Sequence, residues 1–192
     1  MIDQHDSGRF LLSLKLFNSV EPIGSLYLLS FNPPRNKKDY KPLVEIVSYC
    51  LNPNHYHLVL KQLTDGGISE LMKRLNGGYA WYFNNKHKRS GALFQGKFKS
   101  VHIDDNDYLL HLSVYVNLNY KVHQLSGRTA KLCRSSWEEY VGNSKEKGLC
   151  KKDIVLEQFK NKSDYRNFAE DSVKGIIEGR KEDILIDNLL IE

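Results

Sequence analysis

Two strand-like segments joined by a tight turn constrain the fold of this chain more than any other feature of its sequence. Residues 43–50 are rich in β-branched side chains, and residues 55–61 form a second strand-like run. The Asn-Pro-Asn sequence at residues 52–54 is typical of a turn. These segments predict a β-hairpin that belongs to a small antiparallel sheet.

Helices are predicted on both sides of this hairpin along the chain. Apolar residues recur at helical spacing in residues 9–17 and again in residues 68–83, where Gly77-Gly78 weakens the pattern. Between the second of these helices and the next, residues 92–103 are strand-like in part. The first hundred residues thus combine two amphipathic helices with strands.

The second half of the chain is predicted to be mainly helical. Asp104 or Asp105 can cap a helix that runs from about Asp107 to Asn119. The sequence Ser126-Gly127-Arg128 is typical of a junction. Further helical segments are expected near residues 136–141, 152–160 and 164–178, and the last dozen residues are expected to form a short helix or a docked tail.

These elements predict an α+β fold, in which an antiparallel sheet carries helices on its faces and a helical extension follows. A length of 192 residues allows one domain with a proper core, or a domain with a small appendage. We expect a first domain over residues 1–124 and a helical C-terminal extension over residues 125–192.

The sequence contains no signal for a membrane or for export. It has no run of about 18 apolar residues, so no membrane span is expected. The N-terminus is polar and acidic and lacks the apolar segment of an export signal. Cys50, Cys133 and Cys150 are widely spaced and form no pair motif, which suits a reducing cytoplasm. We therefore expect a cytoplasmic protein.

A basic segment without acidic residues extends from Leu71 to Ile103. Tyr, Trp and Phe residues are interleaved with its Lys and Arg residues, a combination that provides phosphate contacts and stacking platforms for bases. The alternative is a solvated helix face whose aromatic side chains lie in the core. The segment is compatible with nucleic-acid binding, and it does not by itself decide between the two.

His55 and His57 are spaced to project from the same face of the second strand, because residues i and i+2 of a strand point the same way. Two imidazoles on one face form half of a metal site. Their nitrogen ligands alone would favour Mn²⁺ or Zn²⁺. The alternative is a pair of ordinary surface histidines.

Tyr115 and Asn119 are four residues apart on the predicted helix, so they lie on one helical face. A tyrosine hydroxyl has a pKa of about 10 and is a poor nucleophile near neutral pH. A metal held by His55 and His57 would make a phosphate more electrophilic, and Asn119 would complete its coordination through the amide oxygen. The alternative is a tyrosine with its ring in the core.

The ordered set of these motifs resembles the HUH single-strand transposases, most closely the REP-associated tyrosine transposases. The family's metal-binding strand is matched by YCLNPNHYHLVLKQ, and its DNA-facing helix with the following strand by ELMKRLNGGYAWYFNNKHKRSGALFQGKFKS. Its nucleophile helix is matched by YLLHLSVYVNLN, and a motif of its C-terminal part by SSWEEYVG. The similarity spans residues 9–142, continues more weakly to about residue 175, and implies an HUH fold of the ferredoxin or RRM type.

The resemblance implies a role for each matching residue. His55 and His57 correspond to the paired metal ligands, Asn119 to a third ligand, and Tyr115 to the nucleophile. The implied reaction is a transesterification that forms a 5′-phosphotyrosine link and releases a 3′-hydroxyl, with Mg²⁺ or Mn²⁺ as the metal. The link is then resolved by a second strand end, so no external energy source is needed.

The resemblance also implies a partner, namely hairpins of palindromic repeats in single-stranded DNA, and hence a place near the nucleoid. Contacts with phosphates would fix the position of the protein on the DNA, and contacts with exposed bases would recognise the DNA sequence. Some relatives act as dimers, so both a monomer and a homodimer are compatible with the sequence. The candidate DNA-binding residues are Arg74, Lys86, Lys88, Arg89, Lys97 and Lys99.

The chain departs from the family pattern in two places. The family begins with an interior strand before the first helix, and this strand is expected to be missing here. Tyr120 follows Asn119 where the family commonly has Pro. A DNA-binding protein without cleavage, either a relic or a domesticated regulator, is therefore the main alternative to an active transposase. A plasmid-replication initiator or relaxase is a more remote one, since those proteins are generally larger.

Overall fold

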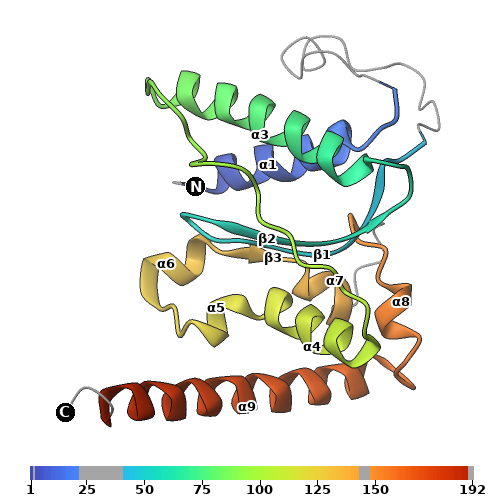
Figure 1. The fold of residues 1–192 in the computed structure, drawn as a ribbon, viewed down its shortest axis with the longest axis vertical. Coiled ribbons are helices and arrows are strands. Elements are labelled where there is room, and N and C mark those ends of the chain that lie inside the picture. Colours follow the sequence, from blue (N-terminus) through green and yellow to red (C-terminus); the bar gives the residue numbers. More distant parts are fainter. Residues whose placement is uncertain (2, 22–40, 143–147, 190–192) are drawn as a thin grey trace. The chain divides into compact units, whose positions relative to one another are not determined.

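The structure is a computed structural model that describes residues 1, 3–21, 41–142 and 148–189 (Figure 1). The chain divides into two compact units, each of which combines separate stretches of the sequence. Unit 1 comprises Met1–Ile46 and Leu60–His102, and unit 2 comprises Val47–Val59 and Ile103–Glu192. The boundary expected after residue 124 falls within unit 2.

The described elements confirm the predicted α+β class, with an antiparallel sheet in the order β2-β1-β3 and helices flanking it. In chain order they are α1 (Gln4–Phe17), β1 (Val44–Leu51), β2 (Tyr56–Gln62), α3 (Gly67–Lys86), α4 (Asn106–Asn117), α5 (Asn119–Val122), α6 (Gly127–Leu132), β3 (Arg134–Ser135), α7 (Trp137–Val141), α8 (Asp153–Leu156) and α9 (Lys162–Leu189). Among the described helices, none has both the length and the apolar character needed to span a membrane.

The predicted hairpin is formed by β1 and β2, and the backbone N–H of Asn52 closes its turn by donating to the His55 carbonyl at 2.9 Å. On the other side of β1, the two-residue strand β3 pairs with Cys50 and Leu51. Ser136 extends this contact, because its backbone N–H donates to the carbonyl of Tyr49 at 3.0 Å. At Tyr49, Cys50 and Leu51, β3 and Ser136 thus pair with the edge of β1 that faces away from β2.

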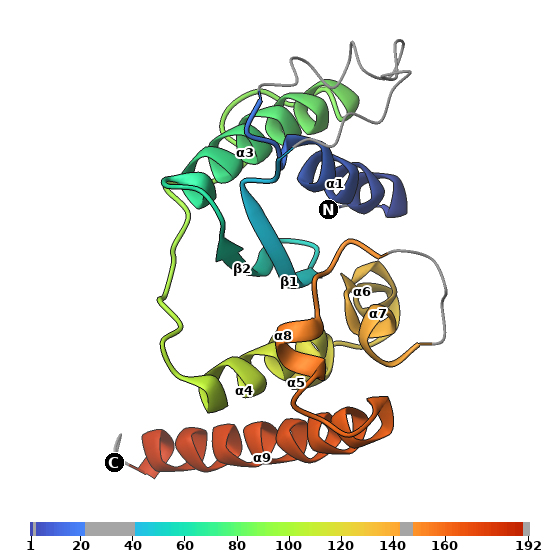
Figure 2. The same cartoon turned by 90° about the vertical axis from the view of Figure 1, so that its right-hand side faces the viewer.

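In unit 1, α1 and α3 lie side by side (Figures 1 and 2). The rings of Phe10 and Tyr79 meet edge to face, with centroids 5.0 Å apart. The Gly77-Gly78 pair does not interrupt α3, although it was expected to weaken the helix. A β-carbon added at Gly78 would come within 2.6 Å of the Phe17 ring, so the missing side chain allows the two helices to approach each other.

The expectation that residues 92–103 are partly strand is wrong, because the backbone of this segment joins no strand ladder and forms bends and irregular loop instead. Gly96 has a φ of 82°, in the left-handed region, which interrupts an extended backbone. The ring of Phe94 packs near Tyr79 of α3, with centroids 6.3 Å apart. Phe94 of this segment thus packs against a helix and takes no part in a strand ladder.

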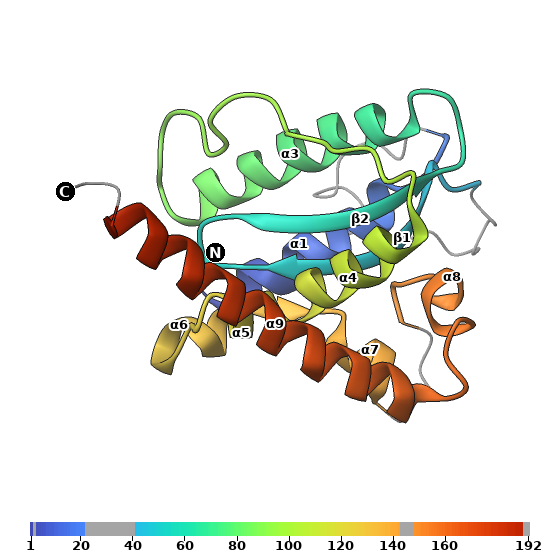
Figure 3. The same ribbon diagram turned by 60° about the horizontal axis from the view of Figure 1, so that its bottom comes forward.

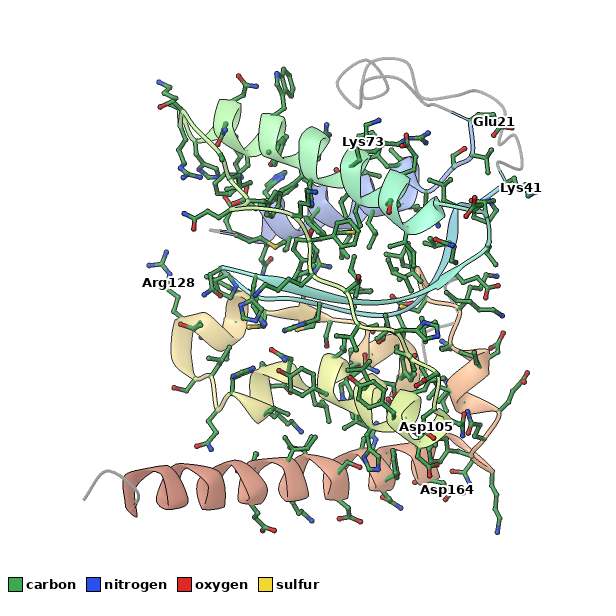
Figure 4. The ribbon with its side chains drawn as sticks, in the orientation of Figure 1. Glu21, Lys41, Lys73, Asp105, Arg128 and Asp164 are labelled. Carbon is green, nitrogen blue, oxygen red and sulfur yellow. The ribbon has the colours of Figure 1, made fainter. Side chains whose placement is uncertain are left out.

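In unit 2, α4 begins as predicted, after Asp105, which is labelled in Figure 4. The side chain of Asp105 accepts from the Tyr108 N–H at 2.7 Å. The long helix α9 runs beside α4 and α5 (Figures 1 and 3). Tyr165 of α9 is fully buried, and its hydroxyl lies 3.1 Å from both Ser113 Oγ and Asn117 Nδ2 of α4. The C-terminal helix is therefore an integral part of the core that supports α4.

Candidate active site

The tip of the hairpin and the end of α4 bring the predicted site residues together within unit 2. The ring centroids of His55 and His57 are 5.0 Å apart, and those of His57 and Tyr115 are 5.7 Å apart. The tyrosine and the two histidines thus lie on the same side of the sheet, as the predicted chemistry requires.

His57 is half-buried, and its Nε2 is a buried atom without a hydrogen-bond partner among the described residues. Burial lowers its pKa to about 4, and the neighbouring His55 and His123 lower the pKa in the same direction. A neutral imidazole with an unsatisfied nitrogen is costly in a protein interior unless a ligand completes it. This nitrogen is therefore well suited to bind a cation.

His55 lies just before β2, and its ring is oriented by its neighbours. Its Nδ1 is 2.8 Å from the side-chain oxygen of Asn54, which can only accept, so the proton lies on Nδ1. Its Nε2 then carries the lone pair and accepts from Asn52 Nδ2 at 2.9 Å. Burial lowers the pKa of His55, so this ring too favours the neutral form that binds metals.

Asn119 is fully buried at the first residue of α5. The predicted helix is interrupted before it, because Leu118 leaves the helical conformation with φ −113° and ψ 24°. The side-chain oxygen of Asn119 accepts from Asn52 Nδ2 at 2.7 Å, while its Nδ2 has no hydrogen-bond partner in the described part of the chain. This oxygen is thus held near His55 through a shared neighbour.

The ring of Tyr115 packs against the core, and its hydroxyl faces the candidate site. Its ring packs partly against the core of unit 2, whereas its hydroxyl lies 3.3 Å from Nε2 of His123. His123 caps the end of α5, and its ring centroid is 6.4 Å from that of His55. Core packing therefore fixes the ring of Tyr115, and the contact with His123 orients its hydroxyl.

Two residues of this site, Asn52 and His123, were not among the predicted ones. His123 follows Tyr115 and Asn119 at the same interval of four residues, and this helical period was a signal for it. Asn52 had no such signal, because its position was explained by the turn alone.

The donor set fits a hard or borderline divalent cation. Within the described ranges, no three His, Cys, Asp or Glu side chains form a metal-binding group, so a metal site here would have to combine the two histidines with amide oxygens. The unpartnered Nε2 of His57 and the acceptor nitrogen of His55 would supply the imidazoles of such a site, and Asn119 would supply an oxygen. A ligand set that includes amide oxygens suits Mn²⁺ or Mg²⁺ better than a set of soft ligands such as thiolates.

The predicted DNA-binding residues lie in unit 1 and divide into two groups. Arg74 bonds with Glu70 at 2.7 Å, and Lys86 bonds with Asp3 and Asp6, each at 2.8 Å. Lys86 is nevertheless exposed, as are the other predicted cations, namely Lys88, Arg89, Lys97 and Lys99. Trp81 of α3 belongs to the same unit and is 57% exposed.

Comparison with known proteins identifies the family. Residues 36–119 match the family described as "Transposase IS200 like", and this range contains His55, His57, Tyr115 and Asn119. No curated protein and no solved structure gave a match to the chain. The predicted transposase family is thus confirmed: the segment of residues 36–119 belongs to the IS200-like transposases.

Proposed function

We propose that this chain is a single-stranded DNA transposase that cleaves and rejoins DNA at hairpin-associated sites through a 5′-phosphotyrosine intermediate. Membership of the IS200-like transposases supports DNA transposition in general. The observation that carries the finer proposal is the position of Tyr115, whose ring lies 5.7 Å from that of His57.

In the proposed reaction, the Tyr115 oxygen attacks the phosphorus of a phosphodiester. The bond from phosphorus to the 3′-oxygen breaks, and that oxygen leaves with a proton as a free 3′-hydroxyl. A 3′-hydroxyl of another strand end then attacks the phosphotyrosine and releases Tyr115. The number of phosphodiester-type bonds stays the same, so the cycle needs no energy source. His123 holds the Tyr115 hydroxyl through its contact at 3.3 Å.

His55, His57 and Asn119 would hold the Mg²⁺ or Mn²⁺ ion of this site. When bound, the ion would polarise a non-bridging phosphate oxygen and offset the charge that develops there. All of these residues and Tyr115 belong to unit 2 of one chain, so the proposed site is complete in a monomer and a homodimer is not required to assemble it.

The proposed DNA surface uses four exposed cations, Lys88, Arg89, Lys97 and Lys99, with Trp81 as a stacking platform. Such cations neutralise phosphates of any sequence, while unpaired bases supply specificity. We place this activity in the cytoplasm near the nucleoid.

The test is covalent trapping. The protein is incubated with single-stranded DNA hairpins from palindromic repeats and Mn²⁺, and a denaturant-resistant protein–DNA adduct is sought by gel electrophoresis. Tyr115→Phe should abolish the adduct and keep DNA binding, since only the nucleophilic oxygen is lost. The matched control is Tyr108→Phe, which removes a hydroxyl from an exposed tyrosine of the same helix and should keep the adduct.

The outcomes separate the proposed function from its alternative. An adduct that persists in Tyr115→Phe would remove Tyr115 from its role. Hairpin binding by the unsubstituted protein without any adduct would favour a DNA-binding regulator or relic that no longer cleaves.

A further inference from the structure

Asn52 occupies a central position in the candidate metal site. It follows the end of β1 and is 1% exposed. Its side-chain nitrogen lies 2.9 Å from Nε2 of His55 and 2.7 Å from the side-chain oxygen of Asn119. One amide group therefore bridges two of the three proposed ligands, which are 64 residues apart in the chain.

This bridge and a bound cation cannot share His55. With its proton on Nδ1, facing Asn54, the ring has a single lone pair on Nε2. That lone pair accepts the N–H of Asn52 in the structure. A cation that binds Nε2 must displace this N–H, so the Asn52 amide cannot keep its present orientation when the site is loaded.

The surroundings of the Asn52 side-chain oxygen allow the carboxamide to rotate by a half-turn. The side-chain oxygen of Asn52 accepts from the Cys50 thiol at 3.6 Å, a weak bond. A thiol sulfur also accepts hydrogen bonds weakly, so it can receive the amide nitrogen after a half-turn of the carboxamide. The turn exchanges nitrogen for oxygen on the side that faces His55 and Asn119, without moving the backbone.

We propose that Asn52 is a further ligand of the cation: it holds His55 and Asn119 together in the metal-free chain and turns its amide oxygen toward the cation when one binds. This inference rests on the proposed metal-dependent function and adds one residue to its site. The complete set is then two imidazole nitrogens and two amide oxygens, from His55, His57, Asn52 and Asn119.

Calorimetric titration with Mn²⁺ alone tests this proposal without any DNA or turnover. Asn52→Leu keeps the volume of a buried side chain and removes its oxygen, so the affinity should fall about 10-fold or more. Asn52→Asp keeps an oxygen at the same position and should bind Mn²⁺ at least as tightly as the unsubstituted protein. The matched control, Asn106→Leu, changes an exposed asparagine of the same unit and should leave the affinity unchanged.

The direction of the Asn52→Leu effect decides the proposal. An affinity equal to that of the control overturns it, and a higher affinity also overturns it, because Asn52 would then only compete with the cation. If the unsubstituted protein binds no cation, both this inference and the proposed metal-dependent function fail, whereas a normal affinity in Asn52→Leu removes the inference alone.

A measurement on the unsubstituted protein covers the case in which Asn52→Leu does not fold. The side-chain amide resonances of Asn52 are followed by ¹⁵N–¹H correlation spectroscopy during titration with Mg²⁺. Their shifts should saturate together with metal binding and exceed those of Asn106. Resonances of Asn52 that stay in place while Mg²⁺ binds would overturn the proposal.

Discussion

At the scale of single residues, His57 shows how an environment changes the chemistry of a side chain. An exposed histidine on a strand would have a pKa of about 6.5 and would gain or lose its proton near neutral pH. Here burial lowers the pKa of His57 to about 4, and the nearby His55 and His123 act in the same direction. The ring is therefore neutral and available to a cation over the whole physiological range.

This pKa predicts how the stability of the metal-free protein depends on pH. The unfolded chain binds a proton at His57 below a pH of about 6.5, whereas the folded chain does so only near pH 4. The free energy of unfolding should therefore fall as the pH is lowered from about 6.5 to 4. Above pH 6.5, His57 is neutral in both states and the protein keeps its full stability. Urea unfolding over a pH series would measure it.

The control for this measurement is His57→Gln, which removes the titrating ring and keeps a polar side chain. Its unfolding free energy should depend less on pH between about 4 and 6.5. The same pH dependence in both proteins would show that the folded state does not disfavour the charged form of His57.

At the scale of elements, the packing of α1 on α3 depends on a single missing side chain. The sequence shows two adjacent glycines in α3, and local propensity treats both as weak points. A β-carbon at Gly78 would lie 2.6 Å from the Phe17 ring, whereas one at Gly77 would meet nothing within 4 Å. Position 78 therefore requires glycine for close helix packing, whereas position 77 has room for a side chain.

Alanine substitutions at the two glycines should have opposite effects on stability. Gly77→Ala should stabilise the protein by about 1 kcal/mol, because alanine favours the helix and has room for its methyl group. Gly78→Ala should destabilise it by about 1–3 kcal/mol, since the methyl group forces Phe17 or the helix to move. Thermal and urea unfolding of the two variants would test this, and equal effects would contradict the described contact.

At the scale of the whole molecule, the two units carry different parts of the proposed function. Unit 1 carries the exposed cations and Trp81, and unit 2 carries the residues of the candidate active site. Among the predicted cations, Arg74 and Lys86 are already paired with carboxylates within unit 1. Because these carboxylates already neutralise them, their contribution to DNA binding should be smaller than that of Lys88, Arg89, Lys97 and Lys99.

Neutralising the exposed cations should weaken hairpin binding and reduce its salt dependence. For single-stranded DNA, each phosphate contact contributes about 0.7 to the slope of log affinity against log salt concentration. Replacing Lys88, Arg89, Lys97 and Lys99 with Gln should thus lower this slope, as measured by fluorescence anisotropy over a salt series. Lys86→Gln is the matched control and should change the slope less, and an unchanged slope in the fourfold variant would place the DNA surface elsewhere.

The sequence by itself determined the features that depend on neighbouring residues. The hairpin, the same-side placement of His55 and His57, and the Asp105 cap of α4 follow from strand alternation, turn residues and capping, which act over a few residues. The interval of four between Tyr115 and Asn119 is likewise local. These features are enough to indicate the family and its candidate chemistry.

Only the tertiary structure decided which distant residues meet. The bridge from Asn52 to His55 and Asn119, the two-residue strand β3, and the ion pairs of Lys86 with Asp3 and Asp6 have no periodic signal in the sequence. Each joins residues that the chain brings together only after its elements have packed. A local pattern specifies which way a side chain points, but the path of the folded backbone specifies what it contacts.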